Sequence, residues 1–243
     1  MKHGWKMVGL LAMGMLGANG AQASLIADGA GLVYDNVANV TWSSDANLFA
    51  TMQAGNPNLV NQIIAAVPTV HDTPYGYGNA GSGSYNLSSG DFSQGTMDWW
   101  GGMAFMGYLN SIDYRGHNTW ELPTTYGQSC YNYNCTNSML GELFYTGLGG
   151  TAGQPITSNH NASYSLFTNV QGYGYWSGTE YALSPSFAWS FYINGLQNAY
   201  NKYNFYYAWA VLPGQAGAAV PEPAGLALFG IGLLGLLAGR RRG

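Results

Sequence analysis

The stretch WSFYING at residues 189–195 decides the fold class of this chain. Its apolar residues stand at every second position up to Ile193, and a two-residue period predicts a β-strand. The dipeptide Asn194-Gly195 follows and predicts a type I′ turn that folds the strand into a hairpin. A further strand is predicted at residues 207–212, with Trp209 and Val211 on one face. The C-terminal part of the chain is therefore expected to be antiparallel sheet.

The earlier part of the chain shows helical spacing instead. Helices are predicted at residues 58–67, 97–110 and 137–148, and short strands at residues 31–35 and 40–42. Pro57 and Pro68 bracket the first helix as its start and stop. Residues 71–95 are rich in Gly, Ser, Tyr and Asn, which predicts a long surface loop. Helices that precede strands indicate an α+β domain rather than an alternating parallel sheet.

Residues 1–23 have the order of a secretory signal peptide. Basic residues precede the apolar run at residues 7–17, and the small residues Ala21 and Ala23 predict cleavage by signal peptidase before Ser24. The apolar run is shorter than the roughly 20 residues that span a bilayer. The protein is therefore expected to be exported with this segment removed.

The C-terminal end also has the character of a processing signal. A small-residue linker at residues 214–220 leads to Pro221-Glu222-Pro223, and the uncharged residues 224–238 follow. As a helix these fifteen residues would measure about 22 Å, less than the ~30 Å hydrocarbon core. The cluster Arg240, Arg241 and Arg242 would keep the end of the chain in the cytoplasm. Taken alone, these residues predict a short membrane anchor.

The order of triplet, apolar helix and arginine cluster at residues 221–243 resembles the PEP-CTERM sorting signal. That resemblance implies a protein of biofilm-forming Gram-negative bacteria, held transiently in the inner membrane by its C-terminal helix. It also implies an exosortase, a membrane cysteine transpeptidase-like enzyme, that cuts near the Pro-Glu-Pro triplet. The product would reach the cell surface or the extracellular matrix.

The charge of the body excludes several classes of partner. Between Ser24 and Val220 the basic residues are Arg115 and Lys202, and two basic against ten acidic residues leave a net charge of −8. Such a body cannot neutralise a phosphate backbone, so nucleic acid is excluded as a partner. Polyanionic glycans are disfavoured for the same Coulombic reason. A surface rich in amides and hydroxyls suits neutral polar ligands instead.

The two cysteines stand close together, at Cys130 and Cys135. In an oxidising compartment a local disulfide is expected between them. These two residues alone do not supply the four ligands that structural zinc requires. The sequence therefore predicts a disulfide and no metal site.

Eight short pieces of the body resemble the Lcl C-terminal domain family, which is named after a collagen-like bacterial adhesin. The pieces are Gly31–Asp35, Thr41-Trp42 with Asp45-Ala46-Asn47, Met97–Trp100, Trp120–Thr124, Glu142-Leu143, Tyr175–Glu180, Ala188-Trp189 and Ala208–Val211. They occur in order within residues 24–213. The resemblance implies a C-type-lectin-like, formylglycine-generating-enzyme-like α+β fold. In such a fold a few helices and long loops surround a small twisted antiparallel sheet.

Three classes of function remain: a binding module, a structural matrix protein and an enzyme. The fold and the loop tyrosines favour a non-catalytic, lectin-like adhesion module for neutral extracellular polysaccharide, because flat rings stack on sugar faces and amides bond hydroxyls. The candidate ligand-binding residues are Tyr75, Tyr77, Tyr85, Tyr131 and Tyr133. A calcium site would need six to eight oxygen ligands, which the sequence does not assemble, so no cofactor is expected.

The enzyme alternative rests on the cysteine pair. Formylglycine-generating enzymes bind copper through two cysteines with the spacing of Cys130 and Cys135. In this sequence the pair follows Leu122-Pro123-Thr124 directly, whereas in those enzymes it lies much further along. The basic residues of their site are also absent. A copper-dependent oxidase is therefore the weaker alternative, and a purely structural biofilm-matrix protein is the stronger one.

The sorting prediction is tested by Glu222→Ala. Loss of this carboxylate from the triplet is expected to leave the protein in the inner membrane with its tail attached. Fractionation and intact-mass analysis in a host with an exosortase measure this outcome. Normal release of the variant would contradict the assignment of the triplet.

Overall fold

The computed structural model describes residues 25–75 and 82–216. Its helices are α1 (Leu48–Gly55), α2 (Leu59–Ala66), α3 (Trp99–Ser111) and α4 (Met139–Glu142), which continues as the π-helix η4 (Leu143–Gly147). Its strands are β1 (Leu25–Ala27), β2 (Leu32–Asp35), β3 (Val40–Ser43), β4 (Thr69–His71), β5 (Ser84–Asn86), β6 (Gly174–Glu180), β7 (Phe187–Tyr192), β8 (Gln197–Asn201) and β9 (Val211–Pro213). Short 3-10 turns are η2 (Ser89–Asp91), η3 (Tyr114–Gly116) and η5 (Ala162–Leu166). The predicted signal peptide and sorting tail lie outside the described residues.

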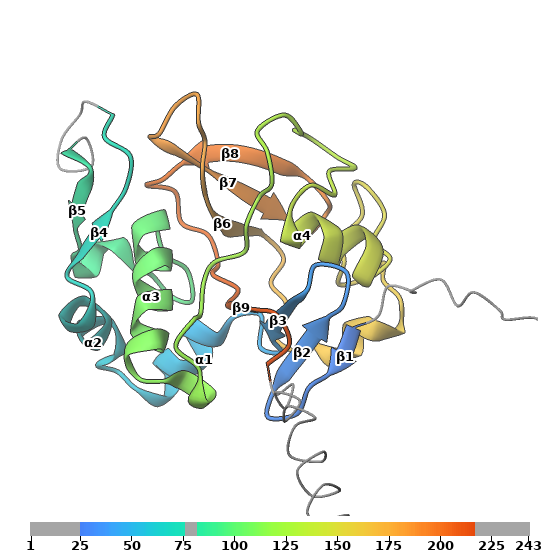
Figure 1. The fold of residues 1–243 in the computed structure, drawn as a ribbon, viewed down its shortest axis with the longest axis horizontal. Coiled ribbons are helices and arrows are strands. Elements are labelled where there is room, and N and C mark those ends of the chain that lie inside the picture. Colours follow the sequence, from blue (N-terminus) through green and yellow to red (C-terminus); the bar gives the residue numbers. More distant parts are fainter. Residues whose placement is uncertain (1–24, 76–81, 217–243) are drawn as a thin grey trace, which may run out of the picture.

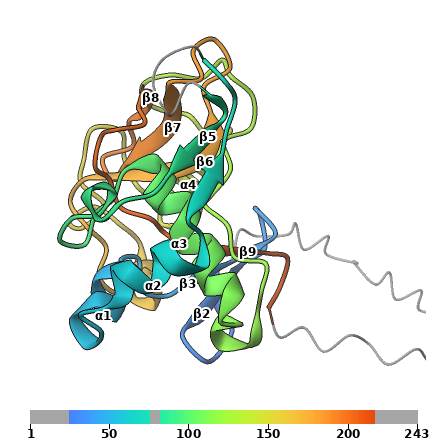
Figure 2. The ribbon, with the colours of Figure 1, turned by 90° about the vertical axis from the view of Figure 1, so that its left-hand side faces the viewer.

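The strands form small antiparallel sheets. Within the described ranges these have the orders β1-β2-β3-β9, β4-β5 and β6-β7-β8. Figure 1 shows α1, α2, α3 and the β4-β5 hairpin on one side of the molecule, and β1, β2, β3 and α4 on the other. In the turned view of Figure 2, β4 and β5 rise beside α3 toward the end that carries β6, β7 and β8. The mixture of helices and antiparallel strands agrees with the predicted α+β class. The prediction was of one small sheet, whereas the described residues form the three sheets given above.

Two hydrophobic clusters fill this arrangement. The first, here called the helical core, joins α1, α2 and α3 through Phe49, Ile63 and Phe105, each 0% exposed. The second, here called the sheet core, contains Trp42 of β3 and Leu143 of η4. Burial of these large side chains supplies the main stabilising free energy, at about 25 cal/mol per Å² of apolar surface.

One extended segment, residues 206–212, lies between the two cores. Its even-numbered side chains join the helical core: Tyr206, Ala208, Ala210 and Leu212. Its buried odd-numbered side chains, Trp209 and Val211, join the sheet core. Successive side chains of extended backbone point to opposite faces, so a single strand can serve both cores. The predicted pairing of Trp209 with Val211 on one face is confirmed, although the sheet ladder begins only at β9.

Backbone hydrogen bonds fix this dividing segment on both sides. Tyr206 exchanges two bonds of 3.0 Å with Met97, which lies two residues before the start of α3. Val211 exchanges bonds of 2.9 and 3.0 Å with Glu121. Val211 also lies opposite Trp42 in the β3-β9 register. The segment therefore joins helices and strands that are far apart in sequence.

The helices largely follow the prediction. The first predicted helix is α2, and the second is α3 shifted by two residues at its start. The third begins at Met139 and changes to π-helical hydrogen bonding before Gly147. Helix α1 was missed, although Asn47 marks its start by accepting a hydrogen bond from the Ala50 N–H at 3.4 Å.

Two local predictions were wrong. Residues 71–95 are not one surface loop, because β5 pairs with β4 and a serine-capped turn follows at η2. The β7-β8 hairpin exists, but its turn is not centred on Asn194-Gly195. The Gly195 N–H donates to the Tyr192 carbonyl at 2.9 Å, and Gly195 has a φ of +91° while Asn194 is not among the positive-φ residues. A type I′ turn requires positive φ at both central residues.

A pair of buried carboxyl groups lies at the start of α3. Asp98 is 2% exposed, and its Oδ1 accepts a hydrogen bond from the Gly101 N–H at 2.8 Å. Asp91 beside it is 6% exposed and accepts a bond from the Tyr85 hydroxyl. Burial is the main reason that the pKa of Asp98 rises to about 8; the charge of Asp91 adds to this rise, and the bond from Gly101 opposes it. At neutral pH Asp98 is therefore protonated and donates to Asp91.

This arrangement predicts a pH-dependent stability. Between about pH 4 and pH 8 the folded protein keeps a proton on Asp98 that an unfolded aspartate, with a pKa near 3.9, has released. Asp98 should therefore lower the free energy of unfolding as pH rises through this range, by up to about 1.4 kcal/mol per pH unit. Asp98→Asn supplies a permanent donor and should remove this contribution, so that the curve becomes less steep in denaturant titrations.

Asp113→Asn is the matched control, because Asp113 is exposed and its side chain makes no cap hydrogen bond. The control should keep the wild-type slope between pH 5 and pH 8. An Asp98→Asn variant with the wild-type slope would contradict the protonated pair.

Candidate functional site

The disulfide loop, residues 130–135, is the first candidate site. Cys130 and Cys135 are bonded, with their Cα atoms 5.7 Å apart, which confirms the predicted disulfide. Asn132 and Asn134 take left-handed backbone conformations, with φ of +78° and +64°. Asparagine adopts this conformation more readily than most residues. The alternation of tyrosine and asparagine in CYNYNC therefore suits a tight loop.

The loop is held against the start of β8 by Gln197, which is 1% exposed. Asn132 and Gln197 exchange backbone bonds of 2.8 and 2.9 Å. The Gln197 Nε2 donates to the Cys130 carbonyl at 2.9 Å, and its Oε1 accepts from the Ser138 hydroxyl at 2.6 Å. A buried amide with donors and acceptors paired in this way fixes the loop in one position.

The loop presents Tyr131 and Tyr133, which are 39% and 38% exposed. The Tyr131 ring lies 4.7 Å from the buried Trp189 ring and 6.0 Å from that of Tyr181, between centroids. Trp189 is itself fixed, because its Nε1 donates to Gln128 Oε1 at 2.9 Å. We call Tyr131, Tyr133 and Tyr181 the tyrosine platform. Packing restrains the rings of Tyr131 and Tyr181, and the disulfide restrains the loop that carries Tyr133. All three side chains stay at least partly exposed.

The other candidate tyrosines do not join this platform. Tyr85 is a correction: it is 9% exposed, its ring stacks 4.0 Å from that of Trp100, and its hydroxyl donates to Asp91. In a strand of three residues only one side chain points inward, so the sequence shows no alternation that could reveal the burial of Tyr85. Tyr75 is half-buried against the helical core. Tyr77 lies outside the described residues.

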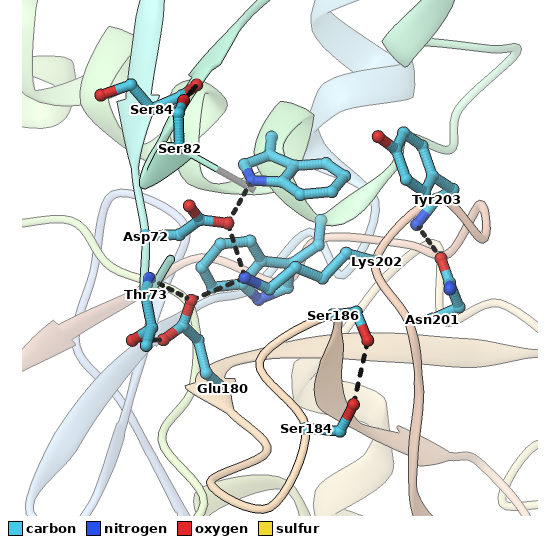
Figure 3. A network of polar contacts seen from close by, with 12 residues as sticks. Asp72, Thr73, Ser82, Ser84, Glu180, Ser184, Ser186, Asn201, Lys202 and Tyr203 are labelled. Atoms are coloured by element: carbon cyan, nitrogen blue, oxygen red, sulfur yellow. Dashed lines mark hydrogen bonds and ion pairs between the residues drawn. The ribbon is translucent and has the colours of Figure 1, made fainter. Parts of the chain in front are cut away.

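The second candidate site is a buried ionic cluster that the sequence did not indicate. The Lys202 Nζ lies 2.7 Å from Asp72 Oδ2 and 2.6 Å from Glu180 Oε1. The side chains of Lys202 and Asp72 are 0% exposed and that of Glu180 is 22% exposed. Figure 3 shows the ammonium between the two carboxylates, with Thr73 beside Glu180. Lys202 directly follows β8, so one strand carries parts of both sites.

Aromatic rings surround the ammonium of this cluster. The Nζ lies 4.3 Å from the Trp99 ring, 5.4 Å from Trp100 and 5.6 Å from Tyr75, measured to the centroids. The Trp100 Nε1 also donates to Asp72 Oδ2 at 2.9 Å. Cation–π attraction and two carboxylates together offset the cost of burying the charge.

The two carboxylates of the cluster differ in their bonding. Burial by itself would raise the pKa of Glu180, but hydrogen bonds from Lys202 and from the hydroxyl and N–H of Thr73 lower it below the ordinary value. Glu180 is therefore ionised at neutral pH. By contrast, Asp72 Oδ1 is buried and has no hydrogen-bond partner among the described residues. An unpaired buried oxygen of this kind is costly to keep.

The ionic cluster opens onto a shallow cleft. Its lining residues are His71, Asp72, Thr73, Trp99, Met103, Gly178 and Glu180. Among the described residues no group of three or more His, Cys, Asp or Glu side chains could hold a metal ion. Glu180 is the partly exposed carboxylate of the cluster that borders this cleft, whereas the Asp72 side chain is fully buried.

Comparison with protein families decides the identity of the body. The Lcl C-terminal domain matches residues 31–212, which is most of the chain. The chain belongs to the Lcl C-terminal domain family. In this Lcl C-terminal domain protein, a PEP-CTERM protein-sorting motif matches residues 219–242. Both resemblances seen in the sequence are thereby confirmed.

The sorting motif indicates that this Lcl C-terminal domain protein is exported and processed by an exosortase. Its predicted apolar helix lies outside the described residues, and none of the described helices is long and apolar enough to cross a membrane. Neither the curated proteins nor the solved structures give a match to the chain.

Proposed function

We propose that this exosortase-sorted extracellular protein is a non-catalytic binding module for neutral polysaccharide, and that the tyrosine platform is its contact surface. The observation that supports this most is the exposure of Tyr131 and Tyr133 on a loop that is fixed at both ends. Tyrosine rings offer flat apolar faces with a polar tip, which suits a sugar ring and its hydroxyls.

Rigidity of the loop favours this role. A ligand that meets a restrained side chain does not have to order it, and ordering costs about 0.5–1.5 kcal/mol for each side chain. Here the disulfide, the buried Gln197 and the packing of Tyr131 on Trp189 restrain the platform in advance.

The charge distribution supports a neutral ligand. Among the described residues the basic side chains are Lys202, which is fully buried, and Arg115, which is exposed. A polyanionic glycan would therefore meet a surface with one accessible cation in the described part of the chain. Polyanions require many such contacts.

We further propose that the protein acts at the cell surface or in the biofilm matrix of a Gram-negative bacterium, and that its fold is related to C-type-lectin-like domains. Both proposals rest on family membership and on the mixed architecture of small antiparallel sheets. Calcium is not required by this account, because stacking and neutral hydrogen bonds carry the binding.

A purely structural matrix role is the alternative, and it predicts no retention on polysaccharide. A copper-dependent oxidase is less compatible with the site. Cys130 and Cys135 are joined in a disulfide, and copper requires free sulfur ligands in that chemistry.

Removal of the platform rings tests the proposal. Tyr131→Ala and Tyr133→Ala should each weaken retention on extracellular polysaccharide from the producing strain by about tenfold, or roughly 1.4 kcal/mol. Their melting temperatures should change little, since surface substitutions usually cost less than about 1 kcal/mol. Affinity electrophoresis and thermal denaturation measure both quantities.

Tyr203→Ala is the matched control, because Tyr203 is 52% exposed but its ring lies against Trp100 of the helical core. It should bind as the wild type does. If the platform variants also bind as the wild type does, or if the wild type never binds, the structural-matrix alternative is the better account.

A further inference from the structure

We propose that Lys202 and Asp72 condense to form an intramolecular isopeptide bond, and that Glu180 carries the protons in this reaction. The bond would join the segment after β4 to the end of β8. It is a single reaction of the chain with itself, so it does not depend on the proposed polysaccharide binding.

The reacting groups are already in contact. The Lys202 Nζ lies 2.7 Å from Asp72 Oδ2, and both side chains are 0% exposed. Holding two groups together in this way raises their effective concentration to about 10⁵ M or more when the geometry is favourable. Removal of water also favours condensation, since water is the product that would reverse it.

The surroundings favour the uncharged product. Condensation replaces a buried ammonium and a buried carboxylate by one neutral amide, and buried charges are costly even when paired. It also removes Asp72 Oδ1, the buried oxygen that has no partner among the described residues. The isopeptide therefore relieves two unfavourable features of the ionic cluster.

Each neighbour has a role in the reaction. Glu180 Oε1, 2.6 Å from the Nζ, is placed to accept a proton from the ammonium and leave a nucleophilic amine. The Trp100 Nε1, 2.9 Å from Asp72 Oδ2, is placed to stabilise negative charge on that oxygen when the amine attacks Cγ. Oδ2 then remains as the amide carbonyl, and Oδ1 is the leaving oxygen.

The reaction balances without an oxidant or a cofactor. The Nζ lone pair forms the bond to Cγ, and the bond from Cγ to Oδ1 breaks. Of the three ammonium protons, one stays on the amide nitrogen and two leave with Oδ1 as water. Glu180 transfers these protons and ends as a carboxylate, as it began. The cleft that Asp72 and Glu180 line gives the water a path to solvent.

The experiment is tryptic digestion of the purified protein after denaturation and reduction. In the mature body trypsin can cut after Arg115 and after Lys202. An isopeptide at Lys202 blocks the second cut and keeps the peptide that contains Asp72 joined to the peptide that follows Arg115. The disulfide cannot produce this link, because both cysteines follow Arg115. Intact mass should be lower by one water molecule.

Two variants separate the reaction from a simple ion pair. Glu180→Gln cannot carry protons and should lose the link, so that the intact mass returns to that of its sequence. Lys202→Arg keeps the positive charge but cannot form the amide, and cleavage at position 202 should resume. The proposal is overturned if the wild-type protein has the mass expected for its sequence with the disulfide as its sole cross-link, and if its peptides separate after cleavage at Arg115. This outcome decides the question even if a variant fails to fold.

Discussion

The structure depends on the extended segment at residues 206–212, which gives alternate side chains to two separate cores. Ala208 and Ala210 are small on the side of the helices, whereas Trp209 and Val211 fill the opposite side. A change of register by one residue would exchange these faces and place the indole among the helices. Neither core can therefore form correctly without this segment in its observed register.

Strand β8 connects the two candidate sites. At its first residue, Gln197 fixes the disulfide loop and so the tyrosine platform. Just beyond its last residue, Lys202 fixes the segment after β4 through Asp72. The body has few charged residues, so this region has few other ionic contacts. One lysine buried with two carboxylates therefore organises it. Under the proposed function, surface recognition is then left to aromatic and amide groups.

Sequence reasoning succeeded where a feature was local or periodic. The stripe of α2 and the shared face of Trp209 and Val211 follow from spacing alone. The disulfide of CYNYNC follows from spacing together with export to an oxidising compartment. It failed for Tyr85, whose burial depends on pairing of two three-residue strands across a Gly/Ser-rich segment. The ionic cluster was also beyond reach, because Lys202 is 130 residues from Asp72 and 22 from Glu180. Only the fold brings these three side chains together.

Native-state hydrogen exchange tests most directly whether one segment unites the two cores. The amides of Tyr206 and Val211 should exchange only through global unfolding, together with those of Ile63 in α2 and Trp42 in β3. All four should then report the same free energy of opening and the same dependence on denaturant. The account is contradicted if the Ile63 amide opens at a clearly lower free energy than the Trp42 amide, while the Val211 amide opens at the free energy of Trp42. That result would show that the two cores unfold independently.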